Sequence, residues 1–119
     1  CPVGWRVPSA DNFKTLLDTT KVDYGWVIQN GVRGVKFTDK FTKKFIFLPY
    51  AGYRDWKNGR LSKVDGSYWS SQQSKPEHTD CTDSPACRYM YYLYMLSPSG
   101  VYLGRYIPLT GLSVRCVSE

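Results

Sequence analysis

The positions of four cysteines constrain the fold of this 119-residue chain more than any other feature of its sequence. Cys1 and Cys116 lie near the two ends, and Cys81 and Cys87 are separated by five residues within one polar segment. Four cysteines allow three pairings. We expect a Cys1–Cys116 disulfide that joins the two ends and a Cys81–Cys87 disulfide that closes a local loop. Such disulfides indicate an oxidising compartment.

Two other uses of these cysteines are a zinc site and four reduced thiols in a cytosolic protein. Zinc is disfavoured because no two cysteines have the gap of about two to four residues found in zinc knuckles. The one histidine, His78, is not placed to complete such a site. The reduced alternative stays open, although disulfides are the preferred interpretation.

Length and composition predict one globular domain over residues 1–119. The chain is 42% hydrophobic and 16% aromatic, which is enough apolar surface to form a core. No apolar run approaches the roughly 20 residues of a membrane span. The N-terminal residues lack the features of a signal peptide. We therefore expect the C-terminal module of a longer exported protein, with any signal or anchor outside this chain.

One helix is predicted near the N-terminus. Ser9 is a suitable N-cap, and Asp11 falls in the first turn. Three apolar residues share one face at helical spacing, namely Phe13, Leu16 and Leu17. This apolar face predicts packing against a sheet.

The remainder predicts short strands connected by turns and long loops. Asn30-Gly31 between two apolar runs indicates a hairpin, and residues 97–100 indicate a second one between 88–96 and 101–106. A buried strand is expected over 45–48, and other strands over 68–71 and 112–117. Long loops are expected over 51–65 and 72–86. The fold class is α+β, with one or two helices packed on mostly antiparallel strands.

Four separated motifs follow one another along the whole chain. They are Cys1-Pro2-x-Gly4-Trp5-Arg6-Val7-Pro8-Ser9, Phe47-Leu48-Pro49-x-Ala51-Gly52-Tyr53-Arg54-Asp55, Tyr68-Trp69-Ser70-Ser71 and Gly111-Leu112-Ser113-Val114-Arg115-Cys116-Val117. Together they resemble the Fibrobacter succinogenes major paralogous domain. That resemblance implies a C-type-lectin-like fold in a secreted or surface protein of Bacteroidetes or Fibrobacteres. It also implies that the termini meet as neighbouring strands, which supports the Cys1–Cys116 pairing.

The resemblance also suggests roles for single residues. Trp5 and Trp69 are expected in the core, and bends or close backbone contacts are expected at Gly4, Gly52 and Gly111. Asn12 stands where the family commonly has an acidic residue, which predicts a weakened capping box. The segment 77–87 adds a cysteine pair that the family pattern does not require.

Catalysis is not expected. The chain has one His and two Glu, so few residues are available for general acid–base chemistry. Ser70-Ser71 lacks a nucleophile elbow and is interpreted as strand hydroxyls. Enzymes that generate formylglycine, which share the implied fold, act through reactive cysteines. Cys81 and Cys87 are therefore the pair to test, with a structural disulfide favoured, and no cofactor is expected.

Calcium is the second chemistry to consider, because many C-type lectins chelate a sugar through it. Their sites use a Glu-Pro-Asn or Gln-Pro-Asp tripeptide and a Trp-Asn-Asp, whereas this chain has Lys75-Pro76-Glu77 and no Trp-Asn-Asp. Glu77, Asp80 and Asp83 are weak candidates, since calcium takes about six to eight oxygen ligands. No metal site is expected.

The net charge of +6 does not predict a nucleic-acid partner. Basic residues are dispersed along the chain, and the cluster Lys40, Lys43 and Lys44 is interpreted as a solvated loop. An anionic glycan or membrane surface is the remaining alternative for that cluster.

Aromatic residues provide the strongest indication of a binding site. The hairpin over 88–106 is rich in tyrosine, and strand alternation places Tyr89 and Tyr91 on one face and Tyr92 and Tyr94 on the other. One face must be core, and Tyr92, Tyr94 and Tyr102 of the partner strand are the candidate ligand contacts. Cross-strand pairs that only stabilise the sheet are the competing interpretation. Trp56 is predicted to be an exposed anchor in a loop beside Arg54 and Arg60, with packing of the loop onto the body as the alternative.

These features predict a non-catalytic recognition or adhesion module that binds a glycan or a host or surface protein without calcium. The expected location is extracellular or on the outer-membrane surface. Two alternatives are a structural domain that displays a larger protein and an enzyme related to formylglycine-generating oxidases.

Overall fold

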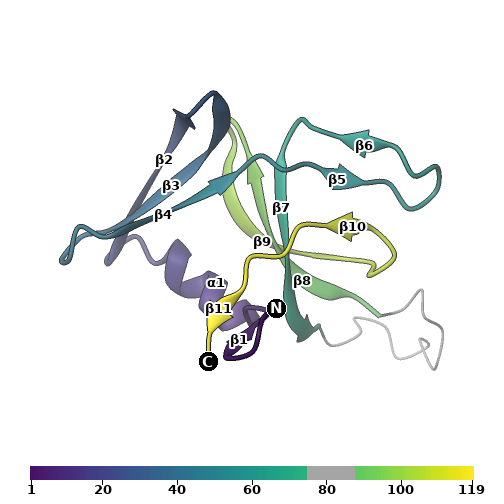
Figure 1. Ribbon diagram of the computed structural model, residues 1–119, viewed down its shortest axis with the longest axis horizontal. Coiled ribbons are helices and arrows are strands. Elements are labelled where there is room, and N and C mark those ends of the chain that lie inside the picture. Colours follow the sequence, from purple (N-terminus) through teal and green to yellow (C-terminus); the bar gives the residue numbers. More distant parts are fainter. Residues whose placement is uncertain (75–87) are drawn as a thin grey trace.

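Strands make up most of the fold, and one short helix packs against them (Figure 1). The computed structural model describes residues 1–74 and 88–119. The elements in this part of the chain are β1 (Trp5–Arg6), α1 (Ala10–Leu17), β2 (Val22–Gln29), β3 (Val32–Asp39), β4 (Phe45–Pro49), β5 (Tyr53–Arg54), β6 (Leu61–Ser62), β7 (Gly66–Gln73), β8 (Met90–Leu96), β9 (Gly100–Tyr106), β10 (Gly111–Leu112) and β11 (Val117–Ser118).

The strands form four small antiparallel sheets. Their orders are β2-β3-β4, β7-β8-β9, β10-β5-β6 and β1-β11. Two isolated parallel bridges, Gly52 to Gly66 and Tyr68 to Ser113, connect the β10-β5-β6 region to β7. The prediction of mostly antiparallel strands with a short helix is confirmed. The structure is therefore an α+β arrangement.

Local sequence signals account for the first helix and the first hairpin. Ser9 is the N-cap of α1, as predicted. Asn30 and Gly31 both have positive φ angles, of 51° and 77°, and they connect β2 to β3 at the pair Gln29–Val32. Two residues with positive φ form the turn that matches the twist of a hairpin, which is why Asn-Gly is favoured there.

The predicted weakening of the capping box at Asn12 is wrong. The Asn12 amide N donates to Ser9 Oγ at 3.2 Å, and the Ser9 amide N donates to Asn12 Oδ1 at 2.9 Å. Arg6 Nη1 also donates to Asn12 Oδ1 at 2.9 Å. An amide oxygen accepts these hydrogen bonds as a carboxylate would, so the capping box is complete.

The core lies between α1 and the two larger sheets. Its buried residues are Phe13, Val35, Phe37, Leu48, Tyr68, Leu93, Met95 and Val101. The Tyr68 hydroxyl donates to the Pro49 carbonyl at 2.7 Å. Burial raises the pKa of Tyr68 to about 12, so this side chain stays protonated and contributes to the core as a neutral group.

Several predictions for the strands and the tryptophans need correction. Residues 45–48 do form a strand, but it is not buried, because β4 is an edge strand in which only Leu48 is fully covered. Trp5 is 49% exposed and outside the core, because β1 pairs only with β11 at the surface. Trp69 is half-buried, and its Nε1 donates to the Thr110 carbonyl at 3.3 Å.

Two segments differ from prediction because pairing partners come from distant parts of the chain. The segment 51–65 was predicted to be a loop, but it contains the β5–β6 hairpin. The segment 112–117 was predicted to be one strand. Instead, β10 pairs with β5, Ser113 bridges to Tyr68, and β11 pairs with β1. This segment pairs in turn with β5, with Tyr68 of β7 and with β1, so a continuous strand does not form.

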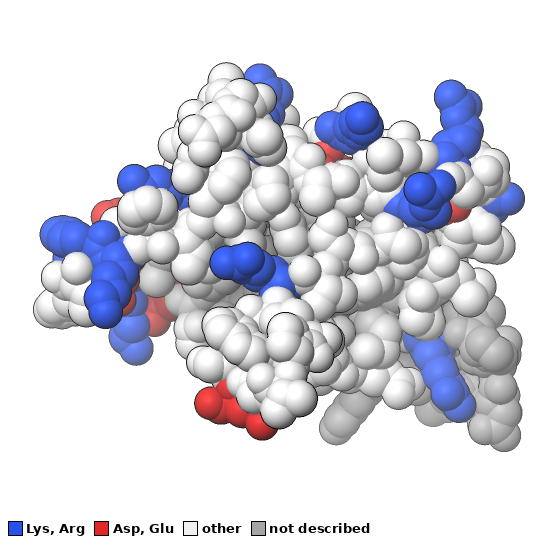
Figure 2. Space-filling model, in the orientation of Figure 1, with Lys and Arg blue, Asp and Glu red and all other residues white. Residues whose placement is uncertain are grey.

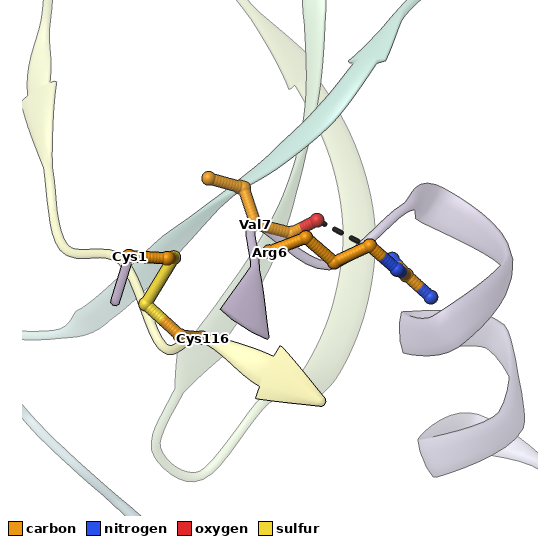
Figure 3. The surroundings of a disulfide bond; sticks show 4 residues. All are labelled: Cys1, Arg6, Val7 and Cys116. Carbon is orange, nitrogen blue, oxygen red and sulfur yellow. Dashed lines mark hydrogen bonds between the residues drawn. A yellow bond between two sulfur atoms is a disulfide. The ribbon is translucent and has the colours of Figure 1, made fainter. Parts of the chain in front are cut away.

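The two ends of the chain lie side by side (Figure 1). Trp5 pairs with Ser118 and Arg6 pairs with Val117. Cys1 and Cys116 form the predicted disulfide, with 5.7 Å between their Cα atoms (Figure 3). The Cys81–Cys87 prediction lies outside the described residues. Within the described ranges, no helix is long and apolar enough to cross a membrane.

Candidate functional site

A pocket opens between the β7-β8-β9 sheet and the β10-β5-β6 sheet, with a cavity volume of about 160 Å³. We call it the tyrosine pocket. Its lining residues are Tyr53, Asp65, Ser67, Tyr92, Tyr94, Tyr106, Thr110 and Leu112. Half of these residues are tyrosines, and they come from β5, β8 and β9.

Strand alternation directs two of these tyrosines into the pocket. Leu93 and Met95 are fully buried on the core face of β8. Tyr92 and Tyr94 alternate with them and therefore lie on the opposite face. Across the ladder, Tyr92 pairs with Gly104 on β9. The predicted alternation along β8 is confirmed, and the structure shows that the face with Leu93 and Met95 is the buried one.

A glycine makes room for the central ring. A Cβ atom built on Gly104 would lie 2.7 Å from Tyr92 Cε1, so the Tyr92 ring sits directly over the glycine. The centroid of this ring is 6.0 Å from that of Trp69, 5.8 Å from that of Tyr94 and 6.2 Å from that of Tyr106. These pairs are tilted or edge-on, which is the geometry that aromatic rings prefer.

The carboxyl group of Asp65 lies within this aromatic wall. Asp65 is only 4% exposed, and its Oδ1 has no hydrogen-bond partner among the described residues. Burial raises the pKa of Asp65, while a hydrogen bond from the Tyr94 hydroxyl acts in the opposite direction. Thr110 Oγ1 is a second buried oxygen without a partner in the described part of the chain. Two residues of the pocket lining, Asp65 and Thr110, therefore each have a buried oxygen without a partner in the described part of the chain.

This arrangement opposes folding. Leaving a buried acceptor unsatisfied costs about 1–3 kcal/mol. Native proteins contain few such groups, and each calls for an explanation, such as a functional role or a bound water or ion. Asp65 is also the only charged residue in the described lining. Asp65 therefore combines a buried carboxyl, one hydrogen bond from Tyr94 and one oxygen without a partner in the described part of the chain.

Burial also affects the tyrosines of the pocket. It raises the pKa of Tyr92 and of Tyr94, and the nearby Asp65 raises both further. Both hydroxyls therefore remain protonated near neutral pH. Protonated hydroxyls donate and accept hydrogen bonds and are poor nucleophiles.

The structure brings together some of the predicted site residues and separates others. Tyr92 and Tyr94 line the pocket. Tyr102 pairs with Tyr94 across the ladder, but it is not part of the lining, and its hydroxyl donates to the Ser99 carbonyl. Trp56, predicted to be an exposed anchor, is 45% exposed in the β5–β6 hairpin, also outside the lining.

The β5–β6 hairpin forms a second surface with basic and aromatic side chains. Arg54 and Arg60 are exposed there, and Arg54 Nη1 donates to the Gly59 carbonyl at 2.7 Å, which stabilises the turn. Lys57 Nζ lies 5.3 Å from the centroid of the Trp56 ring. Because Arg54 directly follows the pocket residue Tyr53, this hairpin is connected to the pocket wall.

Sequence reasoning missed Tyr53, Tyr106, Asp65 and Thr110. Tyr106 lies four residues along β9 from Tyr102 and is therefore on the same face, so strand alternation was a sufficient signal. For Asp65, no local feature of the sequence indicates that it is buried in the pocket wall. It lies in a polar segment, and its burial depends on Tyr94 and on neighbours from other strands.

The described residues contain no group of three or more metal-ligating side chains. The weak calcium candidates Glu77, Asp80 and Asp83 lie outside the described residues. Lys43 and Lys44 are exposed as predicted, whereas Lys40 is partly covered, with its Nζ 3.2 Å from Asp23 Oδ1. In Figure 2, basic side chains gather at the β3–β4 turn and around the β5–β6 hairpin, without forming a continuous stripe.

Comparisons with known proteins give no match from which this geometry could be interpreted. No protein-family model, no curated protein and no solved structure matches the chain. The resemblance of its four motifs to the Fibrobacter succinogenes major paralogous domain therefore stays a prediction from sequence.

Proposed function

We propose that this chain is a non-catalytic recognition or adhesion module of an exported bacterial protein, with a C-type-lectin-like fold. Its ligand is a glycan, or a group presented by a surface protein, that enters the tyrosine pocket without calcium chelation. The observation that carries this proposal is the buried Asp65 carboxyl, whose Oδ1 has no partner, inside a wall of tyrosines.

The terminal geometry supports the lectin-like part of the proposal. Cys1 and Cys116 are bonded, and β1 pairs with β11, so both ends meet as the family resemblance implies. The disulfide also supports an oxidising location, on the cell surface or outside the cell.

The chemistry of the lining favours binding over catalysis. Tyrosine offers a large rigid ring with a polar tip, which suits both sugar stacking and protein contacts. Burial disfavours the phenolate forms of Tyr92 and Tyr94, which are the forms that would act as nucleophiles.

A glycan array and a pull-down from host and bacterial surface proteins test the proposal. We expect the wild-type chain to retain a ligand and Asp65→Asn to lose most of that retention. Phe41→Ala is the matched control, because Phe41 is an exposed aromatic residue (86%) outside the pocket lining. It should bind as the wild type does.

Trp56→Ala distinguishes the pocket from the β5–β6 hairpin. If retention depends on Trp56 and not on Asp65, the ligand binds at the hairpin and the pocket assignment is wrong. If the wild-type chain retains nothing in either assay, the recognition role itself is contradicted.

A further inference from the structure

We propose that the tyrosine pocket selects an amine in its cationic form. The ligand group is the ammonium of a lysine-type alkyl chain or of an amino sugar. This inference rests on the proposed recognition function and specifies the chemistry of its ligand.

The first argument is charge. The chain has sixteen Lys and Arg residues and a net charge of +6, yet none of those that the structure describes lines the pocket. Within residues 1–74 and 88–119, no basic side chain forms an ion pair with Asp65. A buried carboxylate without a counter-charge is unfavourable, and pairing relieves this cost. In this pocket, the compensating charge is left for the ligand to supply.

The second argument is the aromatic wall. The rings of Tyr92, Tyr94 and Tyr106 form a contiguous group with centroid separations of 5.8 Å and 6.2 Å. Tyr53 adds a fourth tyrosine to the lining. Aromatic rings attract cations through the negative potential of their faces, and clusters of rings are a common way to bind ammonium groups.

The third argument is the number of acceptors. An ammonium group has three N–H donors and no acceptor. The lining residues supply two buried oxygens without a partner in the described part of the chain, Asp65 Oδ1 and Thr110 Oγ1, together with the tyrosine hydroxyls. A hydroxyl group on a neutral sugar has one donor. It would satisfy one of these oxygens and leave the charge of the carboxylate uncompensated.

The fourth argument is size. Sites that enclose a whole drug-sized ligand measure about 300–1,000 Å³, whereas this pocket measures about 160 Å³. It therefore accommodates one small group while the rest of a glycan or protein stays outside. An ammonium group with its adjacent carbons is small enough for this volume.

The test is a titration of the ¹⁵N-labelled 119-residue chain by NMR at constant ionic strength, with two matched pairs of probes. Butylammonium is compared with 1-butanol, and glucosamine is compared with glucose. We expect each amine to shift signals of β8 and β10 and to bind at least about tenfold more tightly than its neutral counterpart. The two pairs separate the sources, because a lysine-type ligand favours butylammonium and an amino sugar favours glucosamine.

Two variants locate the effect. Asp65→Asn should weaken amine binding at least about tenfold and leave the weak binding of the neutral probes unchanged. Tyr106→Leu, at a partly exposed wall position, should weaken it several-fold. Phe41→Ala should leave it unchanged. The spectrum of each variant without ligand establishes that it is folded, and Tyr106→Leu tests the inference if Asp65→Asn does not fold.

Equal affinity for amine and neutral probes would overturn the inference, as would amine binding that is unaffected by both variants. The proposed function fails in a different way. If the arrays and pull-downs retain only neutral glycans and do so through Asp65, recognition holds and amine selectivity is wrong. If butylammonium binds through Asp65 while no glycan or protein is retained, the amine site holds and the recognition role is wrong.

Discussion

The disulfide between the chain ends should account for a large part of the stability of this fold. Cys1 and Cys116 are 115 positions apart, so their bond closes almost the entire chain. For a loop of this length, the loop-entropy relation gives a stabilisation of about 4.8 kcal/mol at 25 °C. Domains of this size have total stabilities of about 5–15 kcal/mol. The double variant Cys1→Ser/Cys116→Ser is therefore expected to be only marginally folded.

The local structure shows which part of the fold depends most on this bond. The strands that the disulfide joins, β1 and β11, are two residues long and pair only with each other. Beyond that pairing, the Glu119 amide donates to the Gly4 carbonyl at 3.1 Å. A two-stranded ribbon is marginal on its own. Without the disulfide, both ends should fray from the body.

Urea unfolding followed by tryptophan fluorescence measures the change. We expect the free energy of unfolding to fall by about 4–5 kcal/mol and the Tm to fall by about 15–20 °C. Substitution is preferable to a reductant, because a reductant would also act on the predicted Cys81–Cys87 disulfide. Each single serine variant should lose as much as the double variant, since all three lack the same bond. A loss below about 1 kcal/mol in the double variant would refute the reasoning.

Three further predictions test the pocket and the helix. Burial raises the folded-state pKa of Asp65 above 3.8, so its protonated form favours folding at low pH and this contribution is lost as pH rises through the raised pKa. Asp65→Asn should therefore raise the Tm relative to wild type near neutral pH and not below about pH 4, and an equal gain at every pH would contradict this. Gly104→Ala should destabilise by about 1–3 kcal/mol, because its Cβ would lie 2.7 Å from Tyr92. The control Gly25→Ala, with no atom within 4 Å of the new Cβ, should have little effect in the same urea assay. Asn12→Ala should cost about 1 kcal/mol of stability by urea unfolding, whereas Asn12→Asp should restore it, and an equal loss in both would show that the capping box is not the cause.

Several elements were predictable because their causes are local. The Asn30-Gly31 turn requires positive φ at two adjacent residues, and few other dipeptides tolerate that conformation. The two faces of β8 follow from alternation, which places Leu93 in the core and Tyr92 opposite it. The Cys1–Cys116 disulfide is not local, but the positions of the cysteines and the family resemblance predicted it, and it is confirmed.

Other elements were not predictable from local sequence. β4 has an apolar composition and yet lies at a sheet edge, where Phe45 stays 53% exposed and Lys36 Nζ lies 4.1 Å from the centroid of its ring. Residues 111–118 meet three different partners, so their pattern of apolar residues suggested one strand where the structure has two short ones. These outcomes depend on which distant segments are available to pair, and short-range periodicity contains no such information.

The candidate site likewise has some features that local sequence predicts and others that depend on distant segments. The sequence by itself determined that Tyr92 and Tyr94 share one face of the strand over 88–96, because alternation depends only on backbone geometry. Only the tertiary structure decided that Asp65 lies among them with an unpartnered oxygen, and that Tyr53 and Thr110 complete the wall. Burial and unsatisfied polarity are properties of the folded assembly of distant strands, since a side chain loses its water only when those strands pack around it.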